Sequence, residues 1–224
     1  MSTASEPRSW IVEVWARIFA ILGVLSLFTA IRNVVPRLKA SYRFVEYYVI
    51  GNTALSLGAL AIVTWRRDVG ETLLLAVVTG YGVYRTFEIF VYQVNVLLFD
   101  QYRVESAGGK YAVKGYRRIV ILLLHNCLEI VCWFGVVYMW FYRSGHIVLP
   151  AGSPEPTFFR VFHESLLVMF SLSPAVSLPA SDAGLAVLSV QAIIGLFMTL
   201  MVLARFIAVL PTPESMDEDE GPPR

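Results

Sequence analysis

Apolar and polar positions follow one another along this chain in long blocks rather than in short periods. Five apolar blocks are long enough to cross a bilayer as helices, since a membrane-spanning helix needs about 20 mostly apolar residues. These blocks cover 10–31, 44–65, 71–99, 119–142 and 183–204. The pattern therefore predicts an all-α membrane protein with about five transmembrane helices.

The first of these blocks is less uniform than the others. It contains Glu13 and Arg17, which a spanning helix would hold at or inside the bilayer surface. Charged side chains are costly at that depth. Two alternatives follow for 10–31: a transmembrane helix, or a helix that lies along the membrane surface.

A sixth apolar stretch, 158–180, has a different pattern. Arg160, His163 and Glu164 interrupt it near its start, and two prolines interrupt it near its end. Its apolar centre, 165–172, is too short to cross a bilayer. A short helix followed by proline-broken backbone cannot face lipid, because its backbone groups would lack hydrogen-bond partners. We therefore predict a re-entrant loop between the last two spanning helices.

The composition supports a membrane protein and excludes several other classes. Hydrophobic residues make up 57% of the chain and charged residues 16%, against about 25% charged residues in an average soluble domain. The formal net charge of +1 argues against a nucleic-acid partner, since such proteins usually carry a strong basic excess. No metal-ligand triad, nucleophile–base pair or phosphate-binding loop is evident, so we predict neither an enzyme nor a bound cofactor or metal.

The charges of the loops predict the orientation in the membrane. Segments 32–43 and 100–118 are rich in lysine and arginine, whereas 144–159 contains neither. Positively charged loops stay in the cytoplasm, so the first two loops are predicted to be cytoplasmic and the third external. The N-terminus is then outside and the C-terminus inside, in the plasma (inner) membrane. Arg66 and Arg67 fall outside in this arrangement and count against it.

These features divide the chain into four predicted parts. The third contains the re-entrant loop, and the fourth is acidic and rich in proline, which is typical of a disordered cytoplasmic tail. The connector between the third and fourth apolar blocks holds Gly108-Gly109 and an alternating pattern after it, which predicts a short hairpin within 100–116. The parts are 1–100 with about three transmembrane helices, the cytoplasmic connector 101–116, the pore-like unit 117–210 and the tail 211–224.

The order of helix, external loop, short re-entrant helix, proline-containing return and helix over about 117–211 resembles the pore domain of bacterial two-helix potassium channels. Pro179 matches the proline that follows their filter, and Gly184 and Gly195 match the glycines that open and bend their inner helix. The resemblance implies a homotetramer in the lipid bilayer that conducts monovalent cations. It also implies an outer helix 117–142, a pore helix 158–171, a filter-like strand 171–179 and an inner helix 183–208.

The segment that aligns with the potassium-channel filter departs from the family pattern. Where the family has Thr-Val-Gly-Tyr-Gly, this chain has Ser171, Leu172, Ser173, Pro174 and Ala175. Both glycines are lost, and a residue with a side chain adopts the backbone conformation they supply only at a cost. We therefore expect a pore that is not strictly selective for potassium. Three outcomes stay open: a wider and weakly selective pore, a pore selective for another ion, or a closed plug.

Two acidic residues are candidates for the pore mouth, since rings of carboxylates attract cations. One is Glu164, for which the alternative is a contact with the helix N-terminus, with His163 or with Arg160. The other is Asp182, which also suits a helix cap together with Ser181.

Gly195 and Thr199 are candidate pore residues of the inner helix. Gly195 would let the helix bend, and Thr199, one turn further on, would face a cavity. The rival to a channel is a scaffold or sensor that keeps the pore fold without conduction, closed by a dry constriction at Leu172 and Pro174. Its front helices and acidic tail would then bind a cytoplasmic protein partner.

Ionisable residues inside membrane helices are rare and usually paired or functional. Arg85 and Glu88 lie one turn apart and are predicted to pair. His125, Glu129 and Cys132 share a face of the fourth helix. This face suits a metal site or proton relay, or a buried hydrogen bond to the third helix or another subunit. We favour the hydrogen bond, because the sequence offers no identifiable third ligand on another helix.

The tripeptide Gly80-Tyr81-Gly82 also occurs in potassium-channel filters. Here helical periodicity continues through it, and neither an acid nor a proline follows where a filter would end. Glycines in membrane helices usually permit close packing, and we predict that role. The arginines of the first three blocks are not spaced every third residue, which excludes a conventional voltage sensor.

Overall fold

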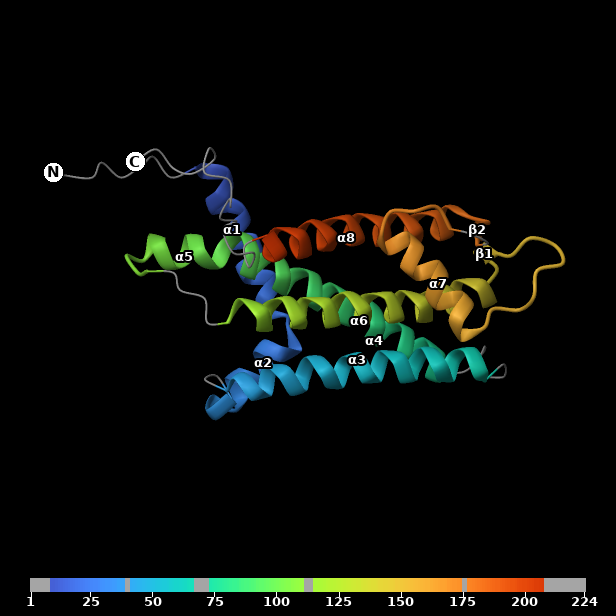
Figure 1. Cartoon of the computed structure of the whole chain (residues 1–224), viewed down its shortest axis with the longest axis horizontal. Coiled ribbons are helices and arrows are strands. Elements are labelled where there is room, and N and C mark those ends of the chain that lie inside the picture. Colours follow the sequence, from blue (N-terminus) through green and yellow to red (C-terminus); the bar gives the residue numbers. More distant parts are fainter. Residues whose placement is uncertain (1–8, 39–40, 67–72, 111–114, 175–176, 208–224) are drawn as a thin grey trace, which may run out of the picture.

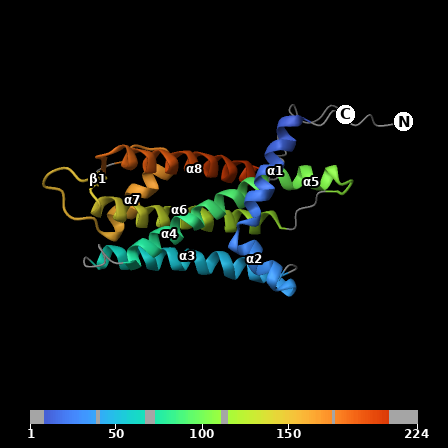
Figure 2. The same cartoon turned by 180° about the vertical axis from the view of Figure 1, so that it is seen from behind.

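The computed structural model describes residues 9–38, 41–66, 73–110, 115–174 and 177–207. Four long helices follow the longest axis of the molecule, and α4 crosses behind α6 at an angle (Figure 1, Figure 2). They are α3 (Tyr42–Trp65), α4 (Leu73–Val94), α6 (Tyr116–Arg143) and α8 (Asp182–Ile207). Each is part of a helix long and apolar enough to span a membrane, which confirms the last four predicted spans.

Helix α6 lies at the centre of the bundle. It packs against α3, α4, α7 and α8, and 56% of its apolar span is buried within the chain, compared with 28% for α8. Gly82 of α4 permits close packing of α4 against α6, because a Cβ at this position would lie 2.7 Å from Cε3 of Trp133. Helix α4 is continuous through Gly80-Tyr81-Gly82. The predicted packing role is confirmed at Gly82, whereas a Cβ at Gly80 would meet nothing within 4 Å.

The first apolar block is not one helix. Helices α1 (Trp10–Val24) and α2 (Leu27–Val34) are separated by a bend of 67° at Leu25 and Ser26. The prediction of a continuous helix over 10–31 is therefore wrong, although the two helices together are still long and apolar enough to form one broken span. A short 3₁₀ turn, η1 (Pro36–Leu38), follows α2.

Side chains of α4 satisfy the backbone groups that the bend leaves without helical partners. The hydroxyl of Tyr84 donates to the carbonyl of Leu25 (2.9 Å) and accepts from the backbone N–H of Leu27 (2.8 Å). The carboxylate of Glu88 accepts from the backbone N–H of Phe28 (2.8 Å). Since broken helices are tolerated at membrane depth where protein groups replace the lost hydrogen bonds, these contacts allow the first block to turn.

The third apolar block extends further than predicted. Helix α4 continues through a π-helical turn, η3 (Asn95–Phe99), into α5 (Asp100–Ser106). The first part of the predicted connector is therefore helix. Asn95 ties the π turn to α1, because its Nδ2 donates to the carbonyl of Phe19 (2.9 Å). The alternating residues 111–114 lie outside the described part of the chain.

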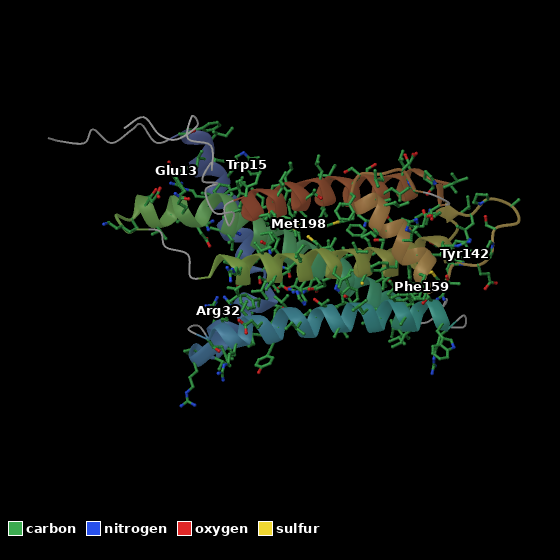
Figure 3. The ribbon with its side chains drawn as sticks, viewed as in Figure 1. Glu13, Trp15, Arg32, Tyr142, Phe159 and Met198 are labelled. Carbon is green, nitrogen blue, oxygen red and sulfur yellow. The ribbon has the colours of Figure 1, made fainter. Side chains whose placement is uncertain are left out.

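The two ends of the bundle differ. At one end lie α2 and α5; at the other, β1 (Ile147–Val148) pairs antiparallel with β2 (Leu178–Pro179), and α7 (Phe158–Met169) runs obliquely between α6 and α8 (Figure 1). Figure 3 shows Arg32 at the first end and Tyr142 and Phe159 at the second. The basic connections thus share one end, and the loop without lysine or arginine lies at the other, as the predicted topology requires.

Candidate functional site

The sixth apolar stretch contains a short helix, α7, wedged between α6 and α8. Thr157 caps its first turn by accepting a hydrogen bond from the backbone N–H of Arg160 (3.4 Å). Its 12 residues are too few to cross a bilayer. One face, which carries Val161, Ser165 and Val168, is buried in the chain. A short helix within the predicted range is therefore confirmed.

Helix α7 ends near the middle of α8. Met169, its last residue, packs against Gly195, which lies well inside α8. At 1.5 Å per residue, Gly195 lies about 20 Å from the start of a helix about 39 Å long. A Cβ at position 195 would lie 2.7 Å from the carbonyl carbon of Met169 and 2.9 Å from its Cα. Glycine is therefore required for α7 to reach this depth beside α8.

The chain turns back directly after α7. The backbone N–H of Ser171 donates to the carbonyl of Val168, and that of Leu172 donates to the carbonyl of Leu167, both at 2.9 Å. These two hydrogen bonds form a Schellman motif, which closes the C-terminus of a helix. Ser171 has a φ of 58°, and no other non-glycine residue in the described ranges has a positive φ. Glycine usually occupies this left-handed position, so Ser171 holds a strained backbone.

We expect Ser171→Gly to leave the protein as stable as the wild type or to stabilise it by up to about 1 kcal/mol, because glycine removes the left-handed strain but adds chain entropy to the unfolded state. Ser171→Val should destabilise it by about 1–2 kcal/mol, since a β-branched residue adopts this conformation poorly. Thermal unfolding of the detergent-solubilised protein measures both. A valine variant as stable as the glycine variant would contradict the strained turn.

The residues aligned with the potassium-channel filter follow this turn. Ser171, Leu172 and Ser173 are exposed in the single chain, with 56% of the Leu172 surface accessible, and Pro174 is half-buried. Ala175 lies outside the described residues. Four of the five predicted residues thus lie together on the irregular turn after α7. Among the residues that the structure describes, no helix or strand covers Ser171, Leu172 or Ser173.

Glu164 holds the segment that returns from this turn. Its side chain is buried, and Oε2 accepts a hydrogen bond from the backbone N–H of Ser177 (3.2 Å). Oε1 has no hydrogen-bond partner in the described ranges, and Glu164 lines a cavity of about 20 Å³ together with Tyr138. Arg160, one of the alternative partners of Glu164, donates its guanidinium instead to the carbonyl of Pro154 (3.0 Å).

Ser181 caps the start of α8. Its Oγ accepts from the backbone N–H of Gly184 (3.2 Å) and lies 2.9 Å from Nδ1 of His146. The predicted cap is confirmed at Ser181. Asp182, the first residue of α8, is exposed and adds negative charge where the helix dipole favours it.

A polar network that the sequence did not bring to notice joins α6, α7 and α8. Gln191 is fully buried, and its Nε2 donates to the carbonyl and to Oγ of Ser165, both at 2.8 Å. The hydroxyl of Tyr138 donates to Oε1 of Gln191, and Oγ of Ser165 donates to the carbonyl of Val131 (2.7 Å). The available signal was Gln191 itself, the one amide side chain in the span 183–204.

Gly195 and Thr199, the two residues predicted to line the pore side of the inner helix, lie in α8 at the level where α7 ends. Close packing against Met169 explains why residue 195 is a glycine, and its role as a hinge stays a prediction. Thr199 follows one turn later, with a buried Oγ1 that has no hydrogen-bond partner in the described part of the chain. Figure 3 labels Met198, the residue before Thr199 in α8, and the side chain of Met198 is fully buried.

A second polar site lies between α3, α4 and α6, apart from α7. Nε of Arg85 donates to Oε1 of Glu129 (2.7 Å), Nη2 donates to Oε2 (3.2 Å), and Nη1 donates to Glu88. All three side chains are buried. The predicted pair of Arg85 with Glu88 is confirmed, and so is the predicted bond from Glu129 to the third spanning helix. We call Arg85, Glu88 and Glu129 the buried charge cluster.

Uncharged hydrogen-bond donors also contact both carboxylates of the buried charge cluster. Glu88 accepts from Oγ of Ser26 (2.7 Å) and from the hydroxyl of Tyr48 (3.1 Å), in addition to the backbone of Phe28. Glu129 accepts from Nε1 of Trp133 (3.2 Å). Buried ions are tolerated when they are paired and fully hydrogen-bonded, which explains how a membrane helix bundle accommodates three charges.

The metal-site alternative for the fourth helix gains no support. Nδ1 of His125 lies 2.9 Å from the carbonyl of Ile121 in the preceding turn, and Cys132 is buried as a free thiol. In the ranges that the structure describes, no group of three or more His, Cys, Asp or Glu side chains is arranged to hold a metal ion.

Over the ranges that the structure describes, the chain is mostly helical, with four helices, or five if the bent pair α1 and α2 counts as one span, that are long and apolar enough to cross a membrane, as in a multi-pass membrane protein. The short helix α7 lies between two of them, α6 and α8, and ends near the middle of α8. Comparison of the chain with protein-family models, with curated proteins and with solved structures finds no match.

Proposed function

We propose that this protein is an ion channel whose pore is formed by four copies of 117–210 around a common axis. The observation that carries this proposal is the place where the chain turns after α7, beside Gly195 near the middle of α8. If α8 spans the bilayer, this turn lies close to the bilayer midplane.

Irregular backbone at that depth cannot face lipid, because its N–H and C=O groups would lose hydrogen bonds. In the single chain, the side chains from Ser171 to Ser173 are exposed. Such a segment is stable at the midplane only if it is buried by other subunits or lines a water-filled passage. Four copies around an axis meet both conditions, since closed symmetry brings identical segments together.

The outward surface of α8 also fits a subunit of a larger assembly. Its exposed side chains are almost all apolar, and 28% of its apolar span is buried within the chain. In the proposed tetramer, part of this surface packs against neighbouring copies and part faces lipid. The exposed apolar residues include Leu185, Ile193, Leu196, Leu200 and Leu203.

The proposed channel conducts monovalent cations without strict potassium selectivity. Ser173 replaces a filter glycine, and Pro174 has no backbone N–H to donate behind the filter. Asp182 and the start of α8 then face the outside, the C-terminus is cytoplasmic, and the membrane is the plasma (inner) membrane, as the basic connections at one end of the bundle favour.

Reversal potentials in planar bilayers test this function. We expect purified full-length protein to carry currents between asymmetric KCl and NaCl solutions, with a potassium-to-sodium permeability ratio of about 1–10 rather than the far larger ratio of a glycine-containing filter. Ser173→Gly should change this ratio or the conductance by at least about twofold, because it alters the constriction. Ser153→Gly, in the external loop, is the matched control and should leave both unchanged.

If the bilayers carry no current at any voltage, at any pH and with any ion, the proposal of a channel is overturned and the scaffold is favoured. In the scaffold, the front helices and the tail bind a cytoplasmic protein. Currents that respond equally to Ser173→Gly and Ser153→Gly would place the permeation path elsewhere.

A further inference from the structure

The bend between α1 and α2 lies close to the start of α3. Phe28, which follows the bend, stacks on Phe44 with 5.8 Å between the ring centroids and packs against Tyr48 at 5.2 Å. Helix α3 begins at Tyr42, so Tyr48 lies about 9 Å, or about a quarter of the way, along a helix about 36 Å long. The bend therefore does not reach the centre of the bundle.

Helix α1 leads from the bend back toward the end of the bundle that holds α5. At the bend, Oγ of Ser26 donates to Glu88 of α4 (2.7 Å). Further from the bend, the carbonyl of Ala16 accepts from Nη2 of Arg103 in α5 (3.0 Å). The contacts of α1 thus pass from α4 to α5 as the helix is followed to its N-terminus, and α1 and α5 share one end of the molecule in both views (Figure 1, Figure 2).

The other side of the bend leads to the same end. Helix α2 is followed by η1 and by the start of α3, where Glu46 pairs with Arg118 near the start of α6 (2.6 Å). Figure 3 shows Glu13 and Trp15 of α1 at this end, together with Arg32 of α2. A segment that enters and leaves at one end of a bundle does not cross the bilayer, although its apolar residues would be enough for a span.

One face of α1 is apolar and exposed. Its residues recur every three or four positions, which places them on one side of a helix. The opposite side is packed on the bundle, where Ala16 is 6% exposed. We call the exposed face the α1 stripe, and it consists of Ile11, Val14, Ile18, Ile21 and Leu25.

The residues beside the α1 stripe suit a membrane surface. Trp10 is 75% exposed and Trp15 is 48% exposed, and tryptophan is enriched where membrane and water meet. Glu13 and Arg17 form an exposed ion pair on the same helix. A helix with an apolar face, flanking tryptophans and a charged edge is typical of one that lies in the interface.

We propose that α1 and α2 form a re-entrant hairpin in one leaflet of the bilayer, with lipid acyl chains covering the α1 stripe and with the N-terminus on the same side as the C-terminus. Interfacial helices bury their apolar face about 5–10 Å into the boundary between headgroups and acyl chains, a depth that the position of the bend along α3 matches. The side chains of Tyr84 and Glu88 supply the hydrogen bonds that the bent backbone needs at this depth.

The hairpin changes the predicted topology. The chain crosses the bilayer four times, through α3, α4, α6 and α8, and 10–31 lies at the membrane surface instead of spanning. In the orientation proposed above, the hairpin occupies the cytoplasmic leaflet, and the N-terminus is cytoplasmic instead of external. None of this depends on ion permeation, so a protein that carries no current would leave the hairpin in place.

Cysteine labelling of the full-length protein in intact cells tests the topology. Ser9→Cys marks the start of α1, Lys110→Cys marks the connector after α5, and Ala151→Cys marks the loop at the opposite end. A charged maleimide does not cross the bilayer core, so permeabilising the cells should raise the labelling of Ser9→Cys and Lys110→Cys by at least about tenfold. Ala151→Cys should react equally before and after. The wild-type protein, whose Cys127 and Cys132 lie within α6, measures the background.

Ser9→Cys that reacts together with Ala151→Cys, while Lys110→Cys does not, would overturn the hairpin and restore the fifth span. If Ser9→Cys and Lys110→Cys both react in intact cells and Ala151→Cys does not, the hairpin is supported and only the orientation in the membrane is reversed.

Spin labels on adjacent residues of α1 test what covers the α1 stripe. In lipid vesicles, a label at Ile18→Cys should collide with dissolved oxygen, which concentrates among acyl chains, and hardly with a water-soluble nickel chelate. The matched label at Arg17→Cys, on the charged edge, should show the opposite preference. Low accessibility of Ile18→Cys to both reagents would show that a second copy or another protein covers the stripe, and high accessibility to nickel would show that water does. Either result would overturn the lipid contact.

Discussion

Replacing Arg85 with glutamine is expected to destabilise the protein by about 3–5 kcal/mol, the largest effect of any single change we consider. Arg85 makes three hydrogen bonds to Glu88 and Glu129, and its side chain is 4% exposed. Its removal leaves two carboxylates buried near each other without a cation. Water cannot solvate them there, so the full cost of the lost pairing falls on the folded state.

Chemical unfolding of the solubilised protein measures this loss of free energy. The matched control is Arg17→Gln, because Arg17 pairs with Glu13 at 2.5 Å but is 76% exposed. That change should cost less than about 1 kcal/mol. Adding Glu129→Gln to Arg85→Gln should recover part of the loss, since it removes one unpaired carboxylate. A double variant less stable than the sum of the two single losses would contradict the pairing.

Gly195→Ala is expected to cost about 3 kcal/mol, near the upper end for an overpacked core. The added Cβ would meet the backbone of Met169, with its carbonyl carbon at 2.7 Å and its Cα at 2.9 Å. A flexible side chain could rotate away from the methyl group, but a helix backbone cannot. Helix α7 must therefore move away from α8, and the turn after α7 moves with it.

The matched control is Gly58→Ala, also inside a spanning helix, where a Cβ meets nothing within 4 Å. It should be neutral or should stabilise the protein by up to about 1 kcal/mol, because alanine favours helix. Thermal unfolding compares the two, with a fall in Tm of about 6–12 °C expected for Gly195→Ala. Equal Tm values would show that α7 does not pack against the middle of α8.

The spanning helices followed from the sequence because the bilayer sets their length. A block of about 20 apolar residues has few other stable arrangements, so the ranges for α3, α6 and α8 agree with the structure to within about three residues. The same rule singled out 158–180 as too short and too broken to cross. The short helix α7 could therefore be predicted without any knowledge of its neighbours.

The bend in the first block could not be predicted in this way. Its stability depends on Tyr84 and Glu88, about sixty residues further along the chain, which replace the lost helical hydrogen bonds. The sequence shows the polar residues on both segments but not that they meet. The sequence predicted a partner for Glu129 on the third spanning helix or on another subunit, and only the structure shows that the partner is Arg85, 44 positions away. The pair within α4 was predictable because one helical turn fixes it.

The candidate sites also contain features that could be predicted from the sequence and features that could not. The sequence by itself determined that Ser171 to Ala175 follow a short helix and lack the filter glycines, because that information lies in consecutive residues. Only the tertiary structure decided that Glu164 holds the returning segment, that Gly195 marks the depth of α7, and that Arg85 pairs with Glu129. The physical reason is range: hydrophobic length and backbone conformation act locally, whereas packing and buried charge depend on which distant residues the fold brings together.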